Sequence, residues 1–405
     1  MIRMVMKGKV RDGMLSRNGI MAVLLAVLAA SSTDAAPQAL DPAYQPAVDA
    51  LYNLDFSTAE RTFTTLTQQH PDDPEYWNAL ASTYWLRILL DQEKLNVETF
   101  NGGMHGQSDA VNSAEEFRLR ATIDSALKKA NALLARNKND VRALYSLGVS
   151  QATLASFEAI AKKSLWSAKD HAKSARNYHE QVLKLDPNYN DARWSVGIYD
   201  YMVGVVPGFW RFWLAMAGIS GNKEEGIRNL EAAAAKGTRA STDAKMLLLA
   251  VYNREKRYAD TIRLTNDLLA KYPRNFAIDM TRASTYGKMK DWNQALVSYQ
   301  KILAKIQAKQ DGYDRMRAER VHLEIGVSDV NRLKNDEAIV AFNQVISGAK
   351  ALDDEKADAL IWLGKIYDSK KDRPKALEQY RAVLKLNCDP GFKDAARKFI
   401  ARPFK

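Results

Sequence analysis

Along most of the chain, apolar residues recur with the spacing of one helix face and not with the alternation of a strand. The segment 243–307 shows this best, because its aromatic positions repeat after 34 residues: Tyr252 matches Tyr286, and Tyr258 matches Trp292. A fixed period of this size, with small and aromatic residues at set places, is typical of stacked helical hairpins. No stretch has the pattern of a strand, so the sequence predicts an all-α repeat protein.

A common template of small and aromatic residues is present within this segment and recurs outside it. Gly364 is followed by Ala376 at offset 12 and by Tyr380 at offset 16. We expect the small residues to let the two helices of a hairpin approach closely, and the aromatic rings to fill the space between successive hairpins. A proline can then stop the second helix. Further sets at these offsets are Ala283, Ala295 and Tyr299; Gly326, Ala338 and Phe342; and Ala47, Ala59 and Phe63, with Pro71 after them.

These residues resemble the tetratricopeptide repeat family, and the resemblance covers most of 41–387. It implies a right-handed superhelix of helical hairpins. The stretch Gly204–Gly226 is also similar to a region of a eukaryotic repeat family linked to mitochondrial outer membranes and inclusion clearance. A longer series of motifs is similar to a family of exported bacterial tetratricopeptide proteins without an assigned activity: Tyr145–Gly148, Val182–Pro187, Gly204–Pro207, Gly221–Gly226, Ala244–Lys245, Tyr272–Asn275 and Gly364–Asp368. Neither resemblance supplies catalytic residues.

The N-terminal 36 residues have the organisation of a secretory signal peptide. A basic start is followed by an apolar run over 20–30 and then by small residues, with a plausible cleavage point near Ala35. The run is too short for an ordinary membrane span, although an uncleaved anchor is the alternative. Cys388 is the one cysteine in the sequence, so no internal disulfide is expected. The protein is therefore predicted to be exported, to the periplasm or beyond the cell.

The places where the repeat period breaks divide the remaining chain. The segment 100–112 contains three glycines and no apolar periodicity, which predicts a loop that is either disordered or a functional projection. The predicted order is a signal peptide over 1–36, repeat-like helices over 41–99, a flexible loop over 100–112, irregular hairpins over 113–206, an apolar insertion over 207–221, regular repeats over 222–387 and a capping tail over 388–405.

Charge and chemistry give little support for an enzyme or a nucleic-acid-binding protein. The formal net charge of +11 is spread over many helices, whereas a nucleic-acid site needs clustering on one face. Among the five histidines, His171 and His179 are about 80° apart around a helix, which does not suit a shared metal ion. No catalytic or phosphate-binding motif is present. The sequence therefore predicts neither an enzyme, nor a metal site, nor a cofactor.

Binding through a concave groove is the better functional hypothesis, since solenoids use this surface for recognition. If the repeat phase holds, the first helix of each hairpin lines the groove, where amides and cations suit a peptide backbone or a carboxylate. The candidate groove residues are Asn253, Arg254, Lys288, Arg320, Asn331 and Lys365. This pattern favours a non-enzymatic scaffold of the cell envelope with a protein or peptide partner. The alternatives are a lipid-contacting protein and an accessory subunit of an enzyme.

The segment 199–219 is the most apolar part of the body. A membrane span is not expected, because Pro207 and Gly208 break the helix in the middle. After this break an apolar stripe follows helical spacing, and each of its side chains would contribute about 1.5–3 kcal/mol if buried. We expect this short helix to lie as a lid over the hairpins within 140–200; a partner or a membrane interface would be the other places for it. The stripe consists of Phe209, Phe212, Trp213 and Met216.

Overall fold

A computed structural model of the 405-residue chain describes residues 41–95, 111–209, 215–216 and 218–404. The predicted signal peptide over 1–36 and the predicted loop up to residue 110 lie outside these residues. All the helices discussed below belong to one compact unit, 42–405.

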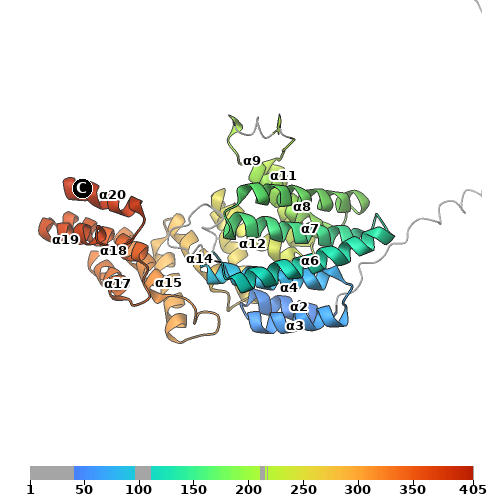
Figure 1. The fold of residues 1–405 in the computed structure, drawn as a ribbon. Helices are drawn as coiled ribbons and strands as arrows, with labels where there is room; N and C mark the ends of the chain where they lie inside the picture. The colour runs from blue at the N-terminus through green and yellow to red at the C-terminus, as the bar shows by residue number, and fades with distance from the viewer. Residues whose placement is uncertain (1–40, 96–110, 210–214, 217, 405) are drawn as a thin grey trace, which may run out of the picture. The chain divides into compact units, whose positions relative to one another are not determined.

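The described chain is a succession of packed helical hairpins, and no strand occurs in the described ranges. This confirms the all-α, tetratricopeptide-type fold. Figure 1 shows the succession from the blue first hairpin to the red last helix. The pairs are α2 (Tyr44–Tyr52) with α3 (Phe56–Gln69), α4 (Pro74–Asp91) with α6 (Ser113–Arg136), α7 (Val141–Ser156) with α8 (Leu165–Leu185), α9 (Arg193–Gly204) with α11 (Lys223–Lys236), α12 (Ser241–Arg254) with α13 (Tyr258–Lys271), α14 (Phe276–Lys288) with α15 (Trp292–Gln307), α16 (Ala318–Asn331) with α17 (Asn335–Ser347), and α18 (Asp353–Ser369) with α19 (Arg373–Val383).

Three shorter or irregular elements complete the fold. A π-helical turn, η1 (Phe157–Ala161), extends α7, and a 3-10 turn, η2 (Asn190–Ala192), precedes α9. The last helix, α20 (Pro390–Ala401), packs on α18 and α19. Its Phe392, Phe399 and Ile400 join the apolar cluster of the last hairpin, so they are covered on one side.

Local sequence accounts for where the helices begin and turn. Asp55, Asp140 and Asn275, for example, each precede a helix and accept a hydrogen bond from its first-turn N–H groups. Between the two helices of several hairpins one residue takes the left-handed conformation, as at Lys290 with φ +62°. In that turn the Asp291 N–H donates to the Tyr286 carbonyl at 2.9 Å, which closes the end of α14.

Inside a hairpin, the small residue of the first helix lies against the aromatic ring of the second. A Cβ atom added at Gly364 would come within 2.3 Å of the Tyr380 ring, and one added at Gly326 within 2.5 Å of the Phe342 ring. Both rings are fully buried. The spacing of 16 residues seen in the sequence therefore corresponds to a direct contact between the two helices.

The N-terminal half departs from a simple solenoid, in which each repeat contacts only its neighbours. The hydroxyl of Tyr52, at the end of α2, donates to Asp243 of α12, and the Asn275 side-chain amide donates to the Tyr52 carbonyl at 2.8 Å. The rings of Tyr52 and Tyr272 lie 5.4 Å apart. The first hairpin therefore packs directly against hairpins that follow roughly 200 residues later.

A buried ion pair reinforces this long-range contact. The Arg239 guanidinium, in the connection before α12, bonds to the Glu75 carboxylate in the first turn of α4, and the two side chains are only 7% and 9% exposed. Asp191 holds the same connection, because its carboxylate accepts from the backbone N–H groups of Arg239 and Ala240, each at 2.8 Å. We refer to residues 44–288 as the N-terminal set and to residues 335–401 as the C-terminal set.

Candidate binding site on the inner helices

Two adjoining cavities lie among the first helices of the hairpins. The larger, which we call the inner cavity, has a volume of about 180 Å³ and is lined from α4, α7, α9, α12 and α14. The smaller, the arginine cavity, has a volume of about 150 Å³ and lies between the end of α4, α14 and the start of α16. They share the lining residues Leu95, Ala277 and Thr281. Both cavities are thus lined mainly from first helices of the hairpins.

The arginine cavity combines an apolar floor with guanidinium groups. Phe276, Met280 and Met316 contribute apolar surface. Three arginines also line it: Arg315, Arg317 and Arg320. This arrangement suits a ligand that carries an anionic group beside an apolar one.

The three arginines differ in what they contact. Arg317 bonds to Glu93 at 2.6 Å and also to Glu355; burial alone would lower its pKa, but these carboxylates raise it, so the group stays charged. Within the described chain, the guanidinium groups of Arg315 and Arg320 form no hydrogen bond and no ion pair with a protein group. These two guanidinium groups therefore keep their donors for a ligand or for water.

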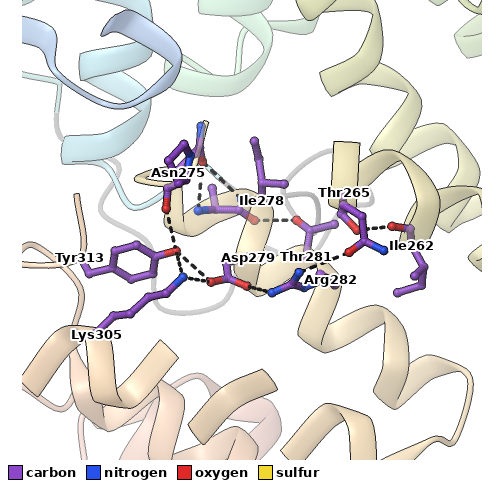
Figure 2. A network of polar contacts seen from close by, with 12 residues as sticks. Ile262, Thr265, Asn275, Ile278, Asp279, Thr281, Arg282, Lys305 and Tyr313 are labelled. Carbon is purple, nitrogen blue, oxygen red and sulfur yellow. Dashed lines mark hydrogen bonds and ion pairs between the residues drawn. The ribbon is translucent and has the colours of Figure 1, made fainter. Parts of the chain in front are cut away.

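A polar network centred on the buried carboxylate of Asp279 lies next to this cavity. Figure 2 shows Asp279 of α14 between Lys305 and Tyr313 on one side and Arg282 on the other. The Tyr313 hydroxyl and the Lys305 ammonium donate to one carboxylate oxygen at 2.8 and 2.7 Å, and Arg282 donates to the other at 2.7 Å. Tyr313 is fully buried, so it anchors the connection that carries Arg315 two residues later.

The structure places the six predicted groove residues in different surroundings. Arg320 lines the arginine cavity, and Arg254 is exposed. Asn253 is buried: its amide donates to Thr285 at 2.9 Å and accepts from Lys288 at 2.7 Å. The predicted groove residues Asn253 and Lys288 therefore bond to each other and connect α12 with α14.

The remaining two predicted residues, Asn331 and Lys365, lie near the C-terminal end. The exposed Asn331 donates to a carbonyl of its own helix at 2.8 Å. The Lys365 ammonium lies 4.2 Å from the Trp362 ring centre and 5.5 Å from that of Phe399, a cation–π arrangement. Burial lowers the Lys365 pKa, which Asp358 partly offsets. Lys365 thus helps to hold α20 on α18.

His179 is a core residue. Its Nε2 lies 3.0 Å from the Tyr145 carbonyl, which can only accept, so Nε2 carries the proton and Nδ1 accepts from the Ser195 hydroxyl. Burial lowers the His179 pKa to about 4, so the ring is neutral at pH 7. Among the described residues, no cluster of three or more His, Cys, Asp or Glu side chains is arranged to hold a metal ion.

The expected burial of the apolar stripe is wrong at its two described positions. Phe209 is 69% exposed and Met216 is 71% exposed; Phe212 and Trp213 lie outside the described residues. The reason lies in how α9 and α11 pair. A Cβ added at Gly204, the last residue of α9, would come within 2.3 Å of the Lys223 backbone nitrogen, where α11 begins. The end of α9 and the start of α11 thus meet directly, so the chain between them leaves and rejoins the fold at one place, and Phe209 and Met216 stay largely exposed.

In the described part of the chain, we find no helix with both the length and the apolar character needed to cross a membrane.

Comparison with known proteins agrees with the fold. Residues 44–91 match the family model described as tetratricopeptide repeat. Together with the described hairpins, this match identifies the fold as tetratricopeptide type. A comparison with curated protein sequences gave no match.

Similar solved structures share little sequence with this chain. In the hetero-tetramer Cut9–Hcn1 of the APC/C, the identity is 12% and the TM-score 0.45; the match covers 86% of this chain but 53% of the other, so this chain spans about half its length. Yeast Tom70 is 13% identical, with 88% of this chain and 87% of that one covered and a TM-score of 0.38. The human IFIT1 dimer with PPP-AAAA is also 13% identical, with 89% and 85% covered and a TM-score of 0.40.

Proposed function

We propose that this protein is a non-enzymatic scaffold of the bacterial cell envelope that binds a protein or peptide partner through its inner helices. The arginine cavity is the proposed contact point, and it would receive a carboxylate of the partner next to an apolar side chain. The observation that carries the proposal is the pair Arg315 and Arg320, whose guanidinium groups have no protein partner in the described chain and stand beside an apolar floor.

The chemistry of these groups supports this assignment. A guanidinium presents a planar fork of donors that matches the two oxygens of a carboxylate, and such charge-assisted bonds are about twice as strong as neutral ones. The floor formed by Phe276, Met280 and Met316 would take an adjacent apolar side chain. The proposed location in the envelope rests on the secretory pattern of residues 1–36.

A pull-down with matched variants tests the proposal. The full chain, with a C-terminal affinity tag, is expressed in bacteria and isolated with its partners from envelope extract, which mass spectrometry identifies. We expect one partner to be retained by the wild type and to be lost at least tenfold in Arg315→Glu with Arg320→Glu. The control is Arg263→Glu with Arg397→Glu, two exposed arginines that, among the described residues, pair only with a carboxylate three residues away. Equal recovery with both double variants would refute the arginine cavity as the contact point.

Membrane contact through the segment 209–219 is the second candidate, because Phe209 and Met216 are exposed. Large apolar side chains in water favour insertion into the boundary of a lipid bilayer. Flotation of the purified protein with anionic vesicles tests this function. The wild type should float, and Phe209→Ser with Met216→Ser should remain at the bottom of the gradient. A wild type that does not float would exclude this candidate.

A further inference from the structure

The inner cavity has a mainly apolar wall that contains one carboxylate. Large apolar side chains from helices far apart in the sequence contribute most of the wall, among them Trp85, Leu86, Val149, Ile160, Met246 and Leu247. Asp243 is the one acidic residue among the described residues that line it. An apolar cavity of about 150 Å³ is large enough to admit a benzene ring. At about 180 Å³, this cavity has room for one ring with a small substituent.

The carboxylate of Asp243 is open to this cavity. Asp243 lies in the first turn of α12, and it is an exposed residue although the cavity that it lines is enclosed by five helices. One of its carboxylate oxygens accepts a hydrogen bond from the Tyr52 hydroxyl. Within the described chain, the other oxygen forms no hydrogen bond and no ion pair with a protein group. Asp243 therefore keeps one acceptor oxygen for a ligand or for water.

No cation of the described chain neutralises this carboxylate. Its position deep in the fold raises the pKa of Asp243 to about 6, and the negative charge of Asp191 adds to this, while the bond from Tyr52 opposes it. The group is thus mostly ionised at neutral pH. Lys94 also lines the cavity, but its side chain is almost fully buried and its ammonium donates to the Ile160 carbonyl at 3.1 Å. A ligand that brings a positive charge would supply the missing partner.

We propose that the inner cavity binds a protonated primary amine on an apolar body of about the size of one ring. The ammonium donates to the Asp243 oxygen that Tyr52 leaves free, and a bond between two charged groups is about twice as strong as a neutral one. The apolar body lies against the apolar wall of the cavity. A free amine and a lysine side chain of a bound peptide share this chemistry. The site is independent of the proposed partner contact, since Arg315 and Arg320 do not line it.

Isothermal titration calorimetry on the purified full chain at neutral pH, with benzylamine, benzyl alcohol and benzoate as probes, tests the proposal. The three probes share a ring with one substituent and are positive, neutral and negative. We expect saturable one-to-one binding of benzylamine, with benzyl alcohol and benzoate each at least about tenfold weaker. Nα-acetyl-lysine methylamide, titrated alongside, distinguishes the two sources of the amine: it should bind more tightly than benzylamine if the site takes a lysine side chain, and more weakly if it takes a free amine. No saturable binding of either amine, or benzyl alcohol binding as tightly as benzylamine, would overturn the proposal.

Two variants with the same chemical change assign the binding to this cavity. Asp243→Asn keeps the size of the side chain and removes its charge, so benzylamine should bind at least about tenfold more weakly and lose its preference over benzyl alcohol. Asp124→Asn, at an exposed position of α6 that lines neither cavity, should bind benzylamine as the wild type does. The comparison of probes on the wild type holds even if Asp243→Asn does not fold. A preference for benzylamine that persists in folded Asp243→Asn would contradict the assigned site.

Discussion

The N-terminal and C-terminal sets use the same hairpin template but connect their repeats over different ranges of sequence. In the N-terminal set, Asn275 bonds to Tyr52 across 223 residues and Arg239 to Glu75 across 164 residues. In the C-terminal set, polar contacts such as that from the Asn387 N–H to Asp353, at 2.8 Å, span 34 residues, about one repeat. The template therefore determines the hairpin, whereas side chains at particular positions determine whether distant hairpins meet.

The long-range contacts of the N-terminal set also shape the two cavities. Both cavities include residues from the end of α4 together with residues from α14, which come close because the first hairpins pack against later ones. The contacts that produce this proximity are polar and buried, so they should be sensitive to single substitutions. The predictions below test this sensitivity, from the largest expected effect to the smallest.

Removing the cation of the buried ion pair should have the largest effect. Arg239→Met leaves Glu75 buried without its partner, and burial already raises the pKa of that carboxyl. Breaking a buried pair on one side typically costs about 3–5 kcal/mol, so the urea midpoint should fall strongly. Hydrogen exchange should show the loss of protection in α4 and α12, while α18 and α19 keep theirs.

An exposed ion pair of the C-terminal set provides the control. Arg397 and Asp394 are 62% and 74% exposed, and Arg397→Met should change the free energy of unfolding by about 0–1 kcal/mol. Restoring neutrality with Glu75→Leu in the Arg239→Met background should recover much of the loss. Equal effects of Arg239→Met and Arg397→Met would mean that the long-range contact does not stabilise the N-terminal set.

The carboxyl of Asp243 should make stability depend on pH. Burial raises its pKa to about 6 from an ordinary value of 3.8, and the nearby Asp191 adds to this effect, while the bond from Tyr52 opposes it. A raised folded pKa contributes stability below pH ~4 that is lost as the pH rises through 6. Relative to wild type, Asp243→Asn should therefore gain about 2 kcal/mol of unfolding free energy between pH 4 and pH 7.

His179 acts in the opposite direction over the same range. Its folded pKa of about 4 lies below the ordinary 6.5, so its contribution is present above pH 6.5 and is lost as the pH falls toward 4. His179 is present in both proteins, so its contribution drops out when the free energy of unfolding of wild type is subtracted from that of Asp243→Asn at each pH. Parallel pH profiles of the two proteins, measured by urea unfolding, would show that Asp243 titrates normally.

Close packing of α9 on α11 predicts a smaller effect. A Cβ at Gly226 would come within 2.4 Å of the Tyr201 backbone nitrogen, and a backbone cannot move aside as a side chain can. Gly226→Ala should cost about 1–3 kcal/mol. At Gly287 the nearest atom is a ring carbon of Trp292 at 3.3 Å, so Gly287→Ala should change stability by less than about 0.5 kcal/mol. Thermal unfolding of both variants checks the order, and the reverse order would contradict the described packing.

The left-handed turn residues predict the smallest effect, and it has the opposite sign. Lys290 has a φ of +62°, a conformation that costs a residue with a side chain roughly 1–2 kcal/mol and glycine much less. Lys290→Gly should therefore stabilise the protein by up to about 1 kcal/mol. The same exchange at Lys301, an exposed position within α15, should destabilise by about 1 kcal/mol. A destabilising Lys290→Gly would show that the turn tolerates lysine without strain.

The sequence predicted the hairpins well because their signals are local. Gly364 and Tyr380 are 16 residues apart and touch, so one repeat contains both partners. The contact between Tyr52 and Asp243 has no such signal in the sequence. The two residues belong to different repeats, and tyrosine and aspartate are ordinary residues at the positions they occupy. Long-range pairing of this kind depends on the accumulated geometry of several hairpins.

The candidate site was predicted only in part, for two physical reasons. Arg320 lies on a first helix, so the repeat phase brought it to the groove, whereas Arg315 lies in the connection after α15, to which the phase does not apply. The sequence did contain a signal for this site: three arginines, Arg315, Arg317 and Arg320, follow Tyr313 within seven residues. The stripe containing Phe209 shows a second reason: apolar spacing indicates a face but does not say what covers it.

The bond between Asn275 and Tyr52 also has a consequence in time. A ribosome adds about 5–20 residues per second, so Asn275 is made roughly ten to forty-five seconds after Tyr52, from which 223 residues separate it. Throughout this interval the end of α2 lacks the contacts that Asn275 provides in the folded protein. The last repeats, in contrast, find their partners within a few seconds of synthesis. A nascent chain halted before residue 275 should therefore be more readily bound by chaperones and cut by proteases than one halted after it.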